Sequence, residues 1–335
     1  MKLLMLGGTV FLGRAIVEQA LVQGHEVTLF NRGQSNATLF PEIEHIHGDR
    51  DGGLEALKGR TFDACVDTCG VVPRIVGASA QFLKDAVRCY AFVSSVSVYG
   101  APSPDGVDKS GVLATLEDPS IEEITGESYG PLKALCEAEV TAAFGNRALL
   151  IRPGLIVGPH DATDRFTYWP WRAAQGGRIL APGRRDRPIQ LIDVRDLAAW
   201  IVRMLAAKST GVYNTASVPG AVTMESLLQT CCDESDKDCD LVWIEDSFLT
   251  RHDVGAWMEL PLWIPEDTDI ARGFFDFKSD RAIEKSLTFR PLEDTVRATM
   301  DWSRARAEDY TWRGGLRPER EADLLSMWLR ESKQR

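Results

Sequence analysis

Short apolar runs alternate with longer amphipathic segments along the first 150 residues. The run Leu3–Leu6 is followed by a helical pattern that carries Leu12, Ile16 and Leu21 and stops at Gly24. Further strands are expected near Val27, His45, Cys65, Phe92 and Leu150. An alternation of strands with helical segments predicts an α/β fold with a doubly wound parallel sheet.

A glycine turn joins the first strand to the first helix. Gly7, Gly8 and Gly13 lie in this turn, and the strand Glu26–Phe30 follows the helix. The N-terminus of a helix after such a turn presents free backbone N–H groups, which bind phosphate. The first 30 residues therefore predict a nucleotide site.

Tyr129 and Lys133 are four residues apart, which places both on one face of a helix. An ammonium group beside a phenol lowers the phenol's pKa from its ordinary value near 10, and so prepares it for proton transfer. Pro131 is compatible with a helix only in its first turn, so Tyr129 should lie at the helix start. Ser95, at the end of an apolar strand, is a third candidate for this site.

Composition and charge limit the kinds of binding partner, the location and the metal sites that we expect. The chain has 335 residues, a formal net charge of −11 and a balanced hydrophobic content of 44%. An acidic chain argues against nucleic acid or an anionic membrane as the main partner. No apolar run is long enough to cross a membrane or to serve as a signal peptide, so we expect a cytoplasmic protein. The seven cysteines have no metal-binding spacing, and we expect no metal site.

Taken together, these motifs resemble the extended, atypical members of the short-chain dehydrogenase/reductase superfamily, in the NAD(P)-dependent epimerase/dehydratase family. The resemblance covers almost the whole chain. It depends on the glycine turn and five later landmarks: Ala91–Gly100, Tyr129–Lys133, Arg152–Pro159, Asp193–Ala198 and Phe277–Trp302. It implies a Rossmann-type sheet and a catalytic site made of Ser95, Tyr129 and Lys133.

The resemblance also implies a set of cofactor-binding residues: Gly7, Thr9, Phe11, Leu12, Gly13, Asn31, Arg32, Asp49, Thr68, Lys133 and Pro153. Val10 departs from the family, which usually has a glycine there, and Gly8 could supply the freedom the turn needs. The second strand ends without the acidic residue that accepts from the ribose of NAD. Asn31 and Arg32 instead suit a 2′-phosphate, so we expect NADP(H) in preference to NAD(H).

The family pattern also divides the chain. We expect residues 1–152 to form the NAD(P)-binding Rossmann domain. Residues 153–335 should form mainly a smaller C-terminal substrate-binding lobe, with core segments near 189–206 returning to the Rossmann domain.

Substrate residues are less constrained by the sequence. Val96 and Ser97 occupy the positions where dehydratases of the family have an acidic pair, so elimination is not expected. Val96, Tyr168, Trp169 and Trp171 are candidate substrate residues, because the three aromatic side chains would suit an apolar or ring-shaped substrate. The same aromatic side chains could instead pack in the core or at a homodimer interface.

The sequence thus predicts an NADP(H)-dependent oxidoreductase that reduces a carbonyl, or oxidises an alcohol, of a small or medium metabolite. One alternative is a sugar or sugar-nucleotide epimerase that oxidises its substrate transiently with a bound cofactor. Another, from a different class, is a catalytically silent NADP-binding regulatory protein. Retention of Ser95, Tyr129 and Lys133 favours an enzyme.

Overall fold

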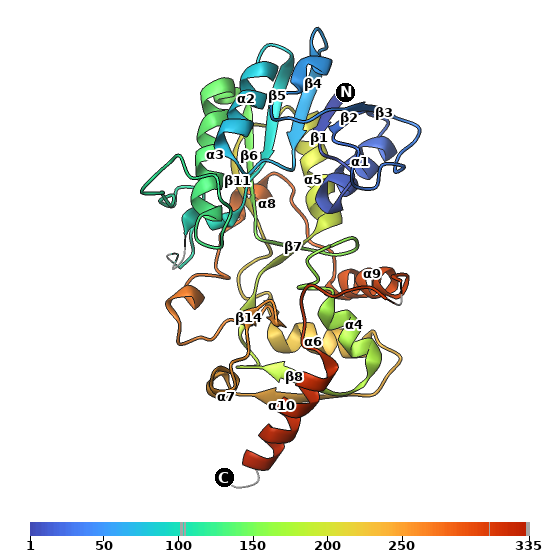
Figure 1. Cartoon of the computed structure of the whole chain (residues 1–335), viewed down its shortest axis with the longest axis vertical. Coiled ribbons are helices and arrows are strands. Elements are labelled where there is room, and N and C mark those ends of the chain that lie inside the picture. Colours follow the sequence, from blue (N-terminus) through green and yellow to red (C-terminus); the bar gives the residue numbers. More distant parts are fainter. Residues whose placement is uncertain (101–102, 104, 308, 333–335) are drawn as a thin grey trace.

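A central parallel sheet organises the upper part of the molecule in the computed structural model, which describes residues 1–100, 103, 105–307 and 309–332 (Figure 1). Within these residues the sheet has seven strands in the order β11-β6-β5-β4-β1-β2-β3. The strands are β1 Lys2–Leu6, β2 Glu26–Asn31, β3 Glu44–His47, β4 Phe62–Asp67, β5 Val87–Val93, β6 Ala148–Pro153 and β11 Gly211–Thr215. The predicted doubly wound Rossmann-type sheet is confirmed.

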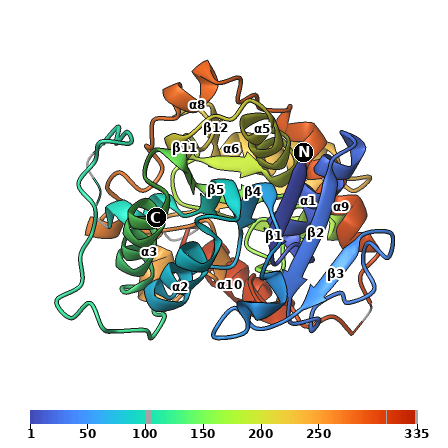
Figure 2. The same cartoon turned by 90° about the horizontal axis from the view of Figure 1, so that it is seen from above.

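Helices cover both faces of this sheet (Figure 2). They are α1 Phe11–Val22 and α5 Val194–Ala206 on one face, and α2 Pro73–Leu83 and α3 Tyr129–Phe144 on the other. Alternate residues of β1 divide between the two cores: Leu3 and Met5 pack with α1 and α5, whereas Leu4 and Leu6 pack with α2 and α3. A strand buried on both faces must be apolar throughout, which explains the continuous run Leu3–Leu6.

The strand order reverses at β1, which lies between β2 and β4. The connections after β1 and β4 therefore leave the sheet in opposite directions and open a crevice at the carboxyl ends of these strands. The glycine turn follows β1, and Thr68-Cys69-Gly70 follows β4. The fold thus brings the two segments together at the position where open α/β sheets bind ligands.

Helix α3 begins at Tyr129, as Pro131 requires. Ser128, just before it, accepts hydrogen bonds from the backbone N–H and the hydroxyl of Thr125. A side chain at Gly130 would lie 2.1 Å from the carbonyl oxygen of Ser97. Only glycine allows the helix start to approach the turn after β5 this closely, and this contact holds Tyr129 next to Ser95.

A second group of elements lies below the sheet in Figure 1 and encloses a core of its own. Its helices are α4 Tyr168–Gln175, α6 Met224–Asp233, α7 Asp246–Arg251, α9 Leu292–Arg304 and α10 Pro318–Glu331. Its strands are β8 Gly177–Pro182, paired with β13 Cys239–Ile244, and the short pairs β7 Leu155–Val157 with β10 Leu191–Asp193, β9 Pro188–Ile189 with β12 Val222–Thr223, and β14 Ala256–Trp257 with β15 Leu260–Pro261. Short 3-10 turns span Leu54–Leu57, Val96–Tyr99, Gly145–Arg147 and Asp269–Ala271.

Three segments of the second half of the chain lie against the sheet. Helix α5 packs on α1, strand β11 extends the sheet beside β6, and α8 (Asp280–Glu284) contacts β11. Of the segments near 189–206 that were expected to return to the Rossmann domain, α5 does so, whereas β9 and β10 pair outside the large sheet. None of the helices in the described residues has the length and apolar content that a membrane crossing requires.

A buried ion pair joins α3 to the sheet. Arg152 on β6 donates from Nε and Nη2 to the two carboxylate oxygens of Glu137, at 2.9 and 2.6 Å, and from Nη1 to the hydroxyl of Tyr99. Both charged side chains are 4% exposed. Tyr99 in turn donates to Asn214 on β11, so one network fixes α3, β6 and β11 together.

We predict that Glu137→Ala lowers the free energy of unfolding by about 3 to 5 kcal/mol, because it leaves the Arg152 cation buried without a partner. Denaturant-induced unfolding followed by circular dichroism measures the loss. Asp240→Ala is the control: it breaks the exposed pair with Arg178 and should change stability by less than about 1 kcal/mol. Equal effects of the two substitutions would contradict the structural role of the buried pair.

Candidate active site

A single large cavity lies at the carboxyl ends of β1, β4 and β5, between the sheet and the second group of elements. Its volume is about 1760 Å³, well above the usual 300 to 1,000 Å³ or so of a small-molecule pocket. The cavity therefore has room for a dinucleotide and a substrate together. The catalytic and cofactor-binding residues expected from the sequence all line it, and so does Val96.

The glycine turn leaves no space for side chains. Gly7 and Gly8 have φ angles of +102° and +96°, and a Cβ at Gly8 would lie 2.6 Å from Leu29. A Cβ at Gly13 would lie 3.0 Å from the Gly8 backbone, so α1 can approach the turn only with glycine at this position. This close packing directs the start of α1 into the cavity.

Val10 fits the turn without strain. Its backbone is extended, with φ −129° and ψ 136°, and its side chain is 46% exposed. The positive φ angles of the turn fall on Gly7, Gly8 and Phe11 and not on Val10, so Gly8 provides freedom that the family usually obtains at the position of Val10. Val10 also makes no side-chain hydrogen bond to cap α1, which leaves the first N–H groups of the helix free for a phosphate.

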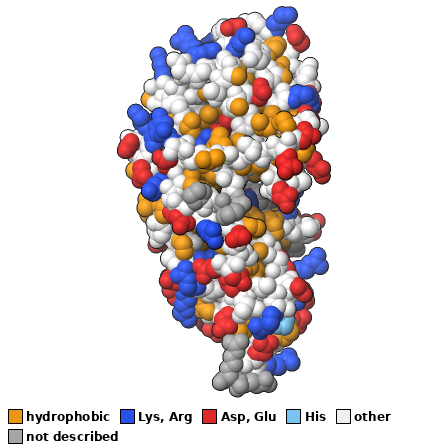
Figure 3. Space-filling view, turned by 90° about the vertical axis from the view of Figure 1, so that its left-hand side faces the viewer, with side chains coloured by type: hydrophobic (Ala, Val, Ile, Leu, Met, Phe, Trp, Pro, Cys, Tyr) orange, Lys and Arg blue, Asp and Glu red, His pale blue; other side chains and the backbone are white. Residues whose placement is uncertain are grey.

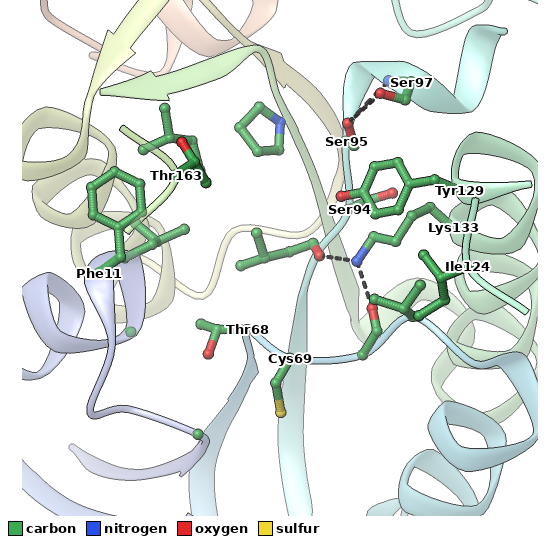
Figure 4. A pocket seen from close by; sticks show the side chains of 18 of the residues that line it. Phe11, Thr68, Cys69, Ser94, Ser95, Ser97, Ile124, Tyr129, Lys133 and Thr163 are labelled. Atoms are coloured by element: carbon green, nitrogen blue, oxygen red, sulfur yellow. Dashed lines mark hydrogen bonds between the residues drawn. The ribbon is translucent and has the colours of Figure 1, made fainter. Parts of the chain in front are cut away.

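Two buried polar groups mark the middle of the cavity (Figure 4). Lys133 is 3% exposed, and its Nζ donates to the carbonyl oxygens of Gly70 and Val93 at 2.7 and 2.6 Å. An ammonium has three protons, so one remains for a ligand. Ser94, also 3% exposed, has a buried hydroxyl without a partner in the described residues. These unsatisfied donors fit the ribose end of a nicotinamide dinucleotide.

The phenol of Tyr129 points into the cavity beside Ser95 (Figure 4). Burial raises the pKa of Tyr129, and the Ser95 hydroxyl and the Arg165 guanidinium oppose that rise. The expectation that Lys133 lowers this pKa is therefore wrong, because burial prevails and the opposing cation is Arg165. Burial lowers the pKa of Lys133 to about 8, with Asp67 opposing the shift.

A second buried ion pair lies below the cofactor half of the cavity. Arg50 donates to both carboxylate oxygens of Asp67 at 2.7 Å, and Tyr90 donates to one of them at 2.9 Å. Burial alone would raise the pKa of Asp67, but the Arg50 guanidinium lowers it. A carboxylate held ionised at the end of β4 fixes the segment Thr68–Gly70 against the glycine turn.

The end of β2 contributes Asn31 and Arg32 in different ways. The Asn31 amide donates to the carbonyl oxygen of Gly7 and accepts from the N–H of Gly33, so it positions the glycine turn. Arg32 is exposed at the cavity edge, and its side chain has no hydrogen bond or ion pair within the described part of the chain. Of the two residues, Arg32 is thus the one free to meet a phosphate.

The aromatic side chains expected at the substrate end lie elsewhere. Tyr168 and Trp169 are each 1% exposed and pack in the core of the second group of elements, where Trp169 donates to Pro261. Trp171 packs on Trp312 with ring centroids 4.5 Å apart. None of the three lines the cavity, so their assignment as substrate residues is corrected to packing residues. Helix α4 begins at Tyr168, and its register directs these rings inward.

Other residues form the substrate end of the cavity. Apolar side chains make up most of it: Trp257, Ile270, Phe274, Phe275 and Phe277. Asp161, Thr163, Arg165 and Gln190 add the polar groups. The sequence analysis missed these residues. Two signals could have indicated them: Arg165 lies in the same segment as Tyr168, Trp169 and Trp171, and Phe274 and Phe275 form an adjacent aromatic pair.

The comparisons with known proteins agree with this geometry. Residues 63–216 match the model of the NAD dependent epimerase/dehydratase family. An Arabidopsis thaliana protein, chloroplast stem-loop binding protein of 41 kDa b, is 27% identical over 249 residues, or 69% of this chain. The match spans 62% of that relative's length.

Solved structures show the same fold. The enzyme WbmH from Bordetella bronchiseptica, solved with NAD+, has a TM-score of 0.67 at 17% identity and covers 91% of this chain and 98% of its own. Human epimerase family protein SDR39U1, solved with NADPH, has a TM-score of 0.60 at 18% identity and covers 90% and 99%. Ser95, Tyr129 and Lys133 of the cavity all fall within the matched region, so this part of the chain is similar to the NAD dependent epimerase/dehydratase family.

Proposed function

We propose that this protein is an NADP(H)-dependent oxidoreductase that interconverts a carbonyl and an alcohol on a small or medium metabolite. The observation that carries the proposal is one cavity lined by Ser95, Tyr129 and Lys133 and also by the unpaired Arg32. The cavity offers proton-transfer groups at one end and a free cation at the other. We further propose that the protein acts in the cytoplasm. That it forms a homodimer remains a prediction from the sequence.

The chain's own residues have separate roles in this reaction. Tyr129 gives a proton to the substrate oxygen in reduction, or takes it in oxidation, and Ser95 hydrogen-bonds the same oxygen. Lys133 directs its third proton toward the cofactor ribose, because Gly70 and Val93 hold the other two. A nicotinamide held in this cavity would supply or accept the hydride. The aromatic wall around Trp257 keeps water from the reacting groups.

Arg32 supports NADP(H) over NAD(H). A guanidinium at the end of β2 can pair with a 2′-phosphate in a fork, and no acidic residue stands there to accept from a free ribose hydroxyl. The structural relatives include one solved with NAD+ and one solved with NADPH, so the choice depends on this chain's own residues.

A specific feature favours the epimerase as the second candidate. Arg187 is 4% exposed, and its Nη1 has no hydrogen-bond partner in the described residues. It lines a smaller cavity of about 550 Å³ that shares Phe274 and Phe275 with the large one. A phosphate group of a sugar nucleotide would satisfy it. An epimerase would purify with tightly bound cofactor and give no net cofactor turnover, which separates it from the first candidate.

Two other classes of function, nucleic-acid binding and catalytically silent regulation, have less support. The Arabidopsis relative is named for stem-loop binding, but this chain carries a net charge of −11, and Lys and Arg intermix with Asp and Glu on the face in Figure 3. On this face the charges of both signs alternate, whereas a phosphate backbone is bound by a continuous basic patch. A silent regulatory protein would not need Ser95 and Tyr129 together in the cavity.

We predict that Tyr129→Phe lowers kcat with NADP(H) by at least about a hundredfold, because it removes the proton donor, while NADPH affinity changes little. Steady-state turnover and NADPH fluorescence titration measure the two effects. Tyr213→Phe is the matched control, since it removes a hydroxyl that donates to the carbonyl oxygen of Thr210 outside the cavity. Turnover of the Tyr129 variant within a few fold of the unmodified protein would exclude the assigned role.

We predict that Arg32→Ala weakens NADP(H) binding by roughly tenfold to a hundredfold, as expected for loss of a charge-assisted hydrogen bond, and leaves NAD(H) affinity almost unchanged. Calorimetric titration with each cofactor gives the ratio. Arg88→Ala removes an exposed arginine on β5 and should leave both affinities unchanged. A clear preference of the unmodified protein for NAD(H) would overturn the cofactor assignment.

We predict that NADPH affinity falls as the pH rises through about 8, the lowered pKa of Lys133. The ammonium is protonated below this pKa and neutral above it, so the proton offered to the ribose is lost on the alkaline side. Fluorescence titration from neutral to alkaline pH measures the decline. Lys133→Met should bind weakly at every pH and show no such decline, and a parallel decline in the variant would attribute the effect to another group.

A further inference from the structure

Arg165 differs from most of the buried or half-buried arginines of the described residues in having no carboxylate within 4.0 Å. The others form ion pairs: Arg50 with Asp67, Arg152 with Glu137, Arg172 with Glu321, Arg290 with Asp196, and Arg306 with Asp164. Arg165 is half-buried in the wall of the large cavity. A cation removed from water without a counter-ion is costly, so its position requires an explanation.

The protein holds this guanidinium in place through neutral or already satisfied groups. Nε of Arg165 donates to the hydroxyl of Thr163 at 3.2 Å, and the guanidinium lies over the ring of Trp257, 5.2 Å from its centroid. The carboxylate of Asp161 accepts from the N–H and the hydroxyl of Thr163 at 2.8 and 3.0 Å, so both of its oxygens are in use. This series of contacts from Asp161 through Thr163 fixes Nε of Arg165, and neither Nη1 nor Nη2 has a hydrogen-bond partner in the described part of the chain.

The remaining polar groups of this wall cannot serve as donors for a ligand. Gln190 donates to the carbonyl oxygens of Ser217 and Phe277 and accepts from the N–H of Phe277, so its amide is fully used. The ring of Trp257, beneath the guanidinium, contacts Phe274 and Phe275, and all three rings line the cavity. Among described residues of the substrate wall, the two Nη groups are thus the free charged donors.

Arg165 also belongs to the reacting end of the cavity. Thr163 faces Tyr129 across the open space in Figure 4, and the Arg165 charge opposes the burial that raises the pKa of Tyr129. Burial lowers the pKa of Arg165 itself, with Asp161 and then Tyr129 opposing the shift. The guanidinium therefore acts within the same low-dielectric space as the phenol.

We propose that the Nη1 and Nη2 fork of Arg165 binds an oxyanion of the substrate, a carboxylate or a phosphate, close to the carbon that is oxidised or reduced. This inference rests on the proposed oxidoreductase function and narrows its substrate class to anionic hydroxy or oxo compounds. The rings of Trp257, Phe274 and Phe275 hold the apolar part of the same molecule. Two parallel N–H groups match the geometry of a carboxylate or phosphate edge.

The test uses the full chain, labelled with ¹⁵N-arginine and saturated with NADP+. Acetate, inorganic phosphate and neutral acetamide are titrated separately, and the Arg165 side-chain signals are assigned by their loss in Arg165→Gln. Acetate or phosphate should shift these signals saturably, and acetamide should not. Comparison of the acetate titration with the phosphate titration shows which oxyanion the Nη1 and Nη2 groups of Arg165 bind more tightly. Calorimetry then compares variants: Arg165→Gln should lose at least about tenfold in affinity for the preferred anion.

Two further variants separate binding from folding. Arg165→Lys keeps the charge over Trp257 but not the fork, and should retain a thermal midpoint close to that of the unmodified protein while binding the anion more weakly. Arg178→Gln, at an exposed arginine paired with Asp240, should bind as the unmodified protein does.

The proposal is overturned if neither anion shifts the Arg165 signals, if acetamide shifts them equally, or if Arg165→Gln binds with unchanged affinity. These outcomes differ from failure of the proposed function. The same titrations are repeated without NADP+, so absent turnover or absent NADP(H) binding would still leave a reading of whether the anions shift the Arg165 signals.

Discussion

The Nζ of Lys133 joins three elements at once, because it donates to Gly70 after β4 and to Val93 at the end of β5 while its own backbone belongs to α3. These bonds fix the start of α3 against the crevice where the strand order reverses. Tyr129, one helical turn earlier, is thereby held beside Ser95. A buried ammonium is costly, and its lowered pKa of about 8 records that cost. An apolar side chain of similar size would pack there at less cost, so the ammonium is retained at the expense of stability.

Two buried ion pairs fix the elements that Lys133 joins. Asp67 and Arg50 fix the segment that follows β4, and Glu137 and Arg152 fix the middle of α3 against β6. Each arginine makes a two-point contact with its carboxylate, which restricts rotation as well as distance. The result is a rigid cofactor half in which the glycine turn, Lys133 and Tyr129 keep fixed relative positions.

The sequence was sufficient for features that depend on local rules. The strands from Leu3 to Leu150, the helix start at Tyr129 and the freedom of Gly8 all follow from residue spacing and backbone sterics. The substrate end was not accessible in this way. Tyr168 and Trp169 were expected in the cavity, but α4 begins at Tyr168 and turns them into the core, whereas the preceding loop residues face the cavity. Trp257 and Phe274, about a hundred positions away, complete the wall through contacts that no local pattern encodes.

The two cations near Tyr129, those of Lys133 and Arg165, have different roles. Lys133 donates to backbone carbonyl oxygens, whereas the Arg165 charge opposes the burial that raises the pKa of Tyr129 and its Nη fork is free among the described residues. An oxyanion bound to Arg165 would cancel much of that cation's field, so the pKa of Tyr129 would rise further and the phenol would remain protonated. A protonated phenol is a proton donor, and a donor is what carbonyl reduction requires. On the proposed assignment, burial already keeps the proton on Tyr129, and the anion that positions the substrate adds to this effect, so the phenol can donate its proton to a substrate carbonyl.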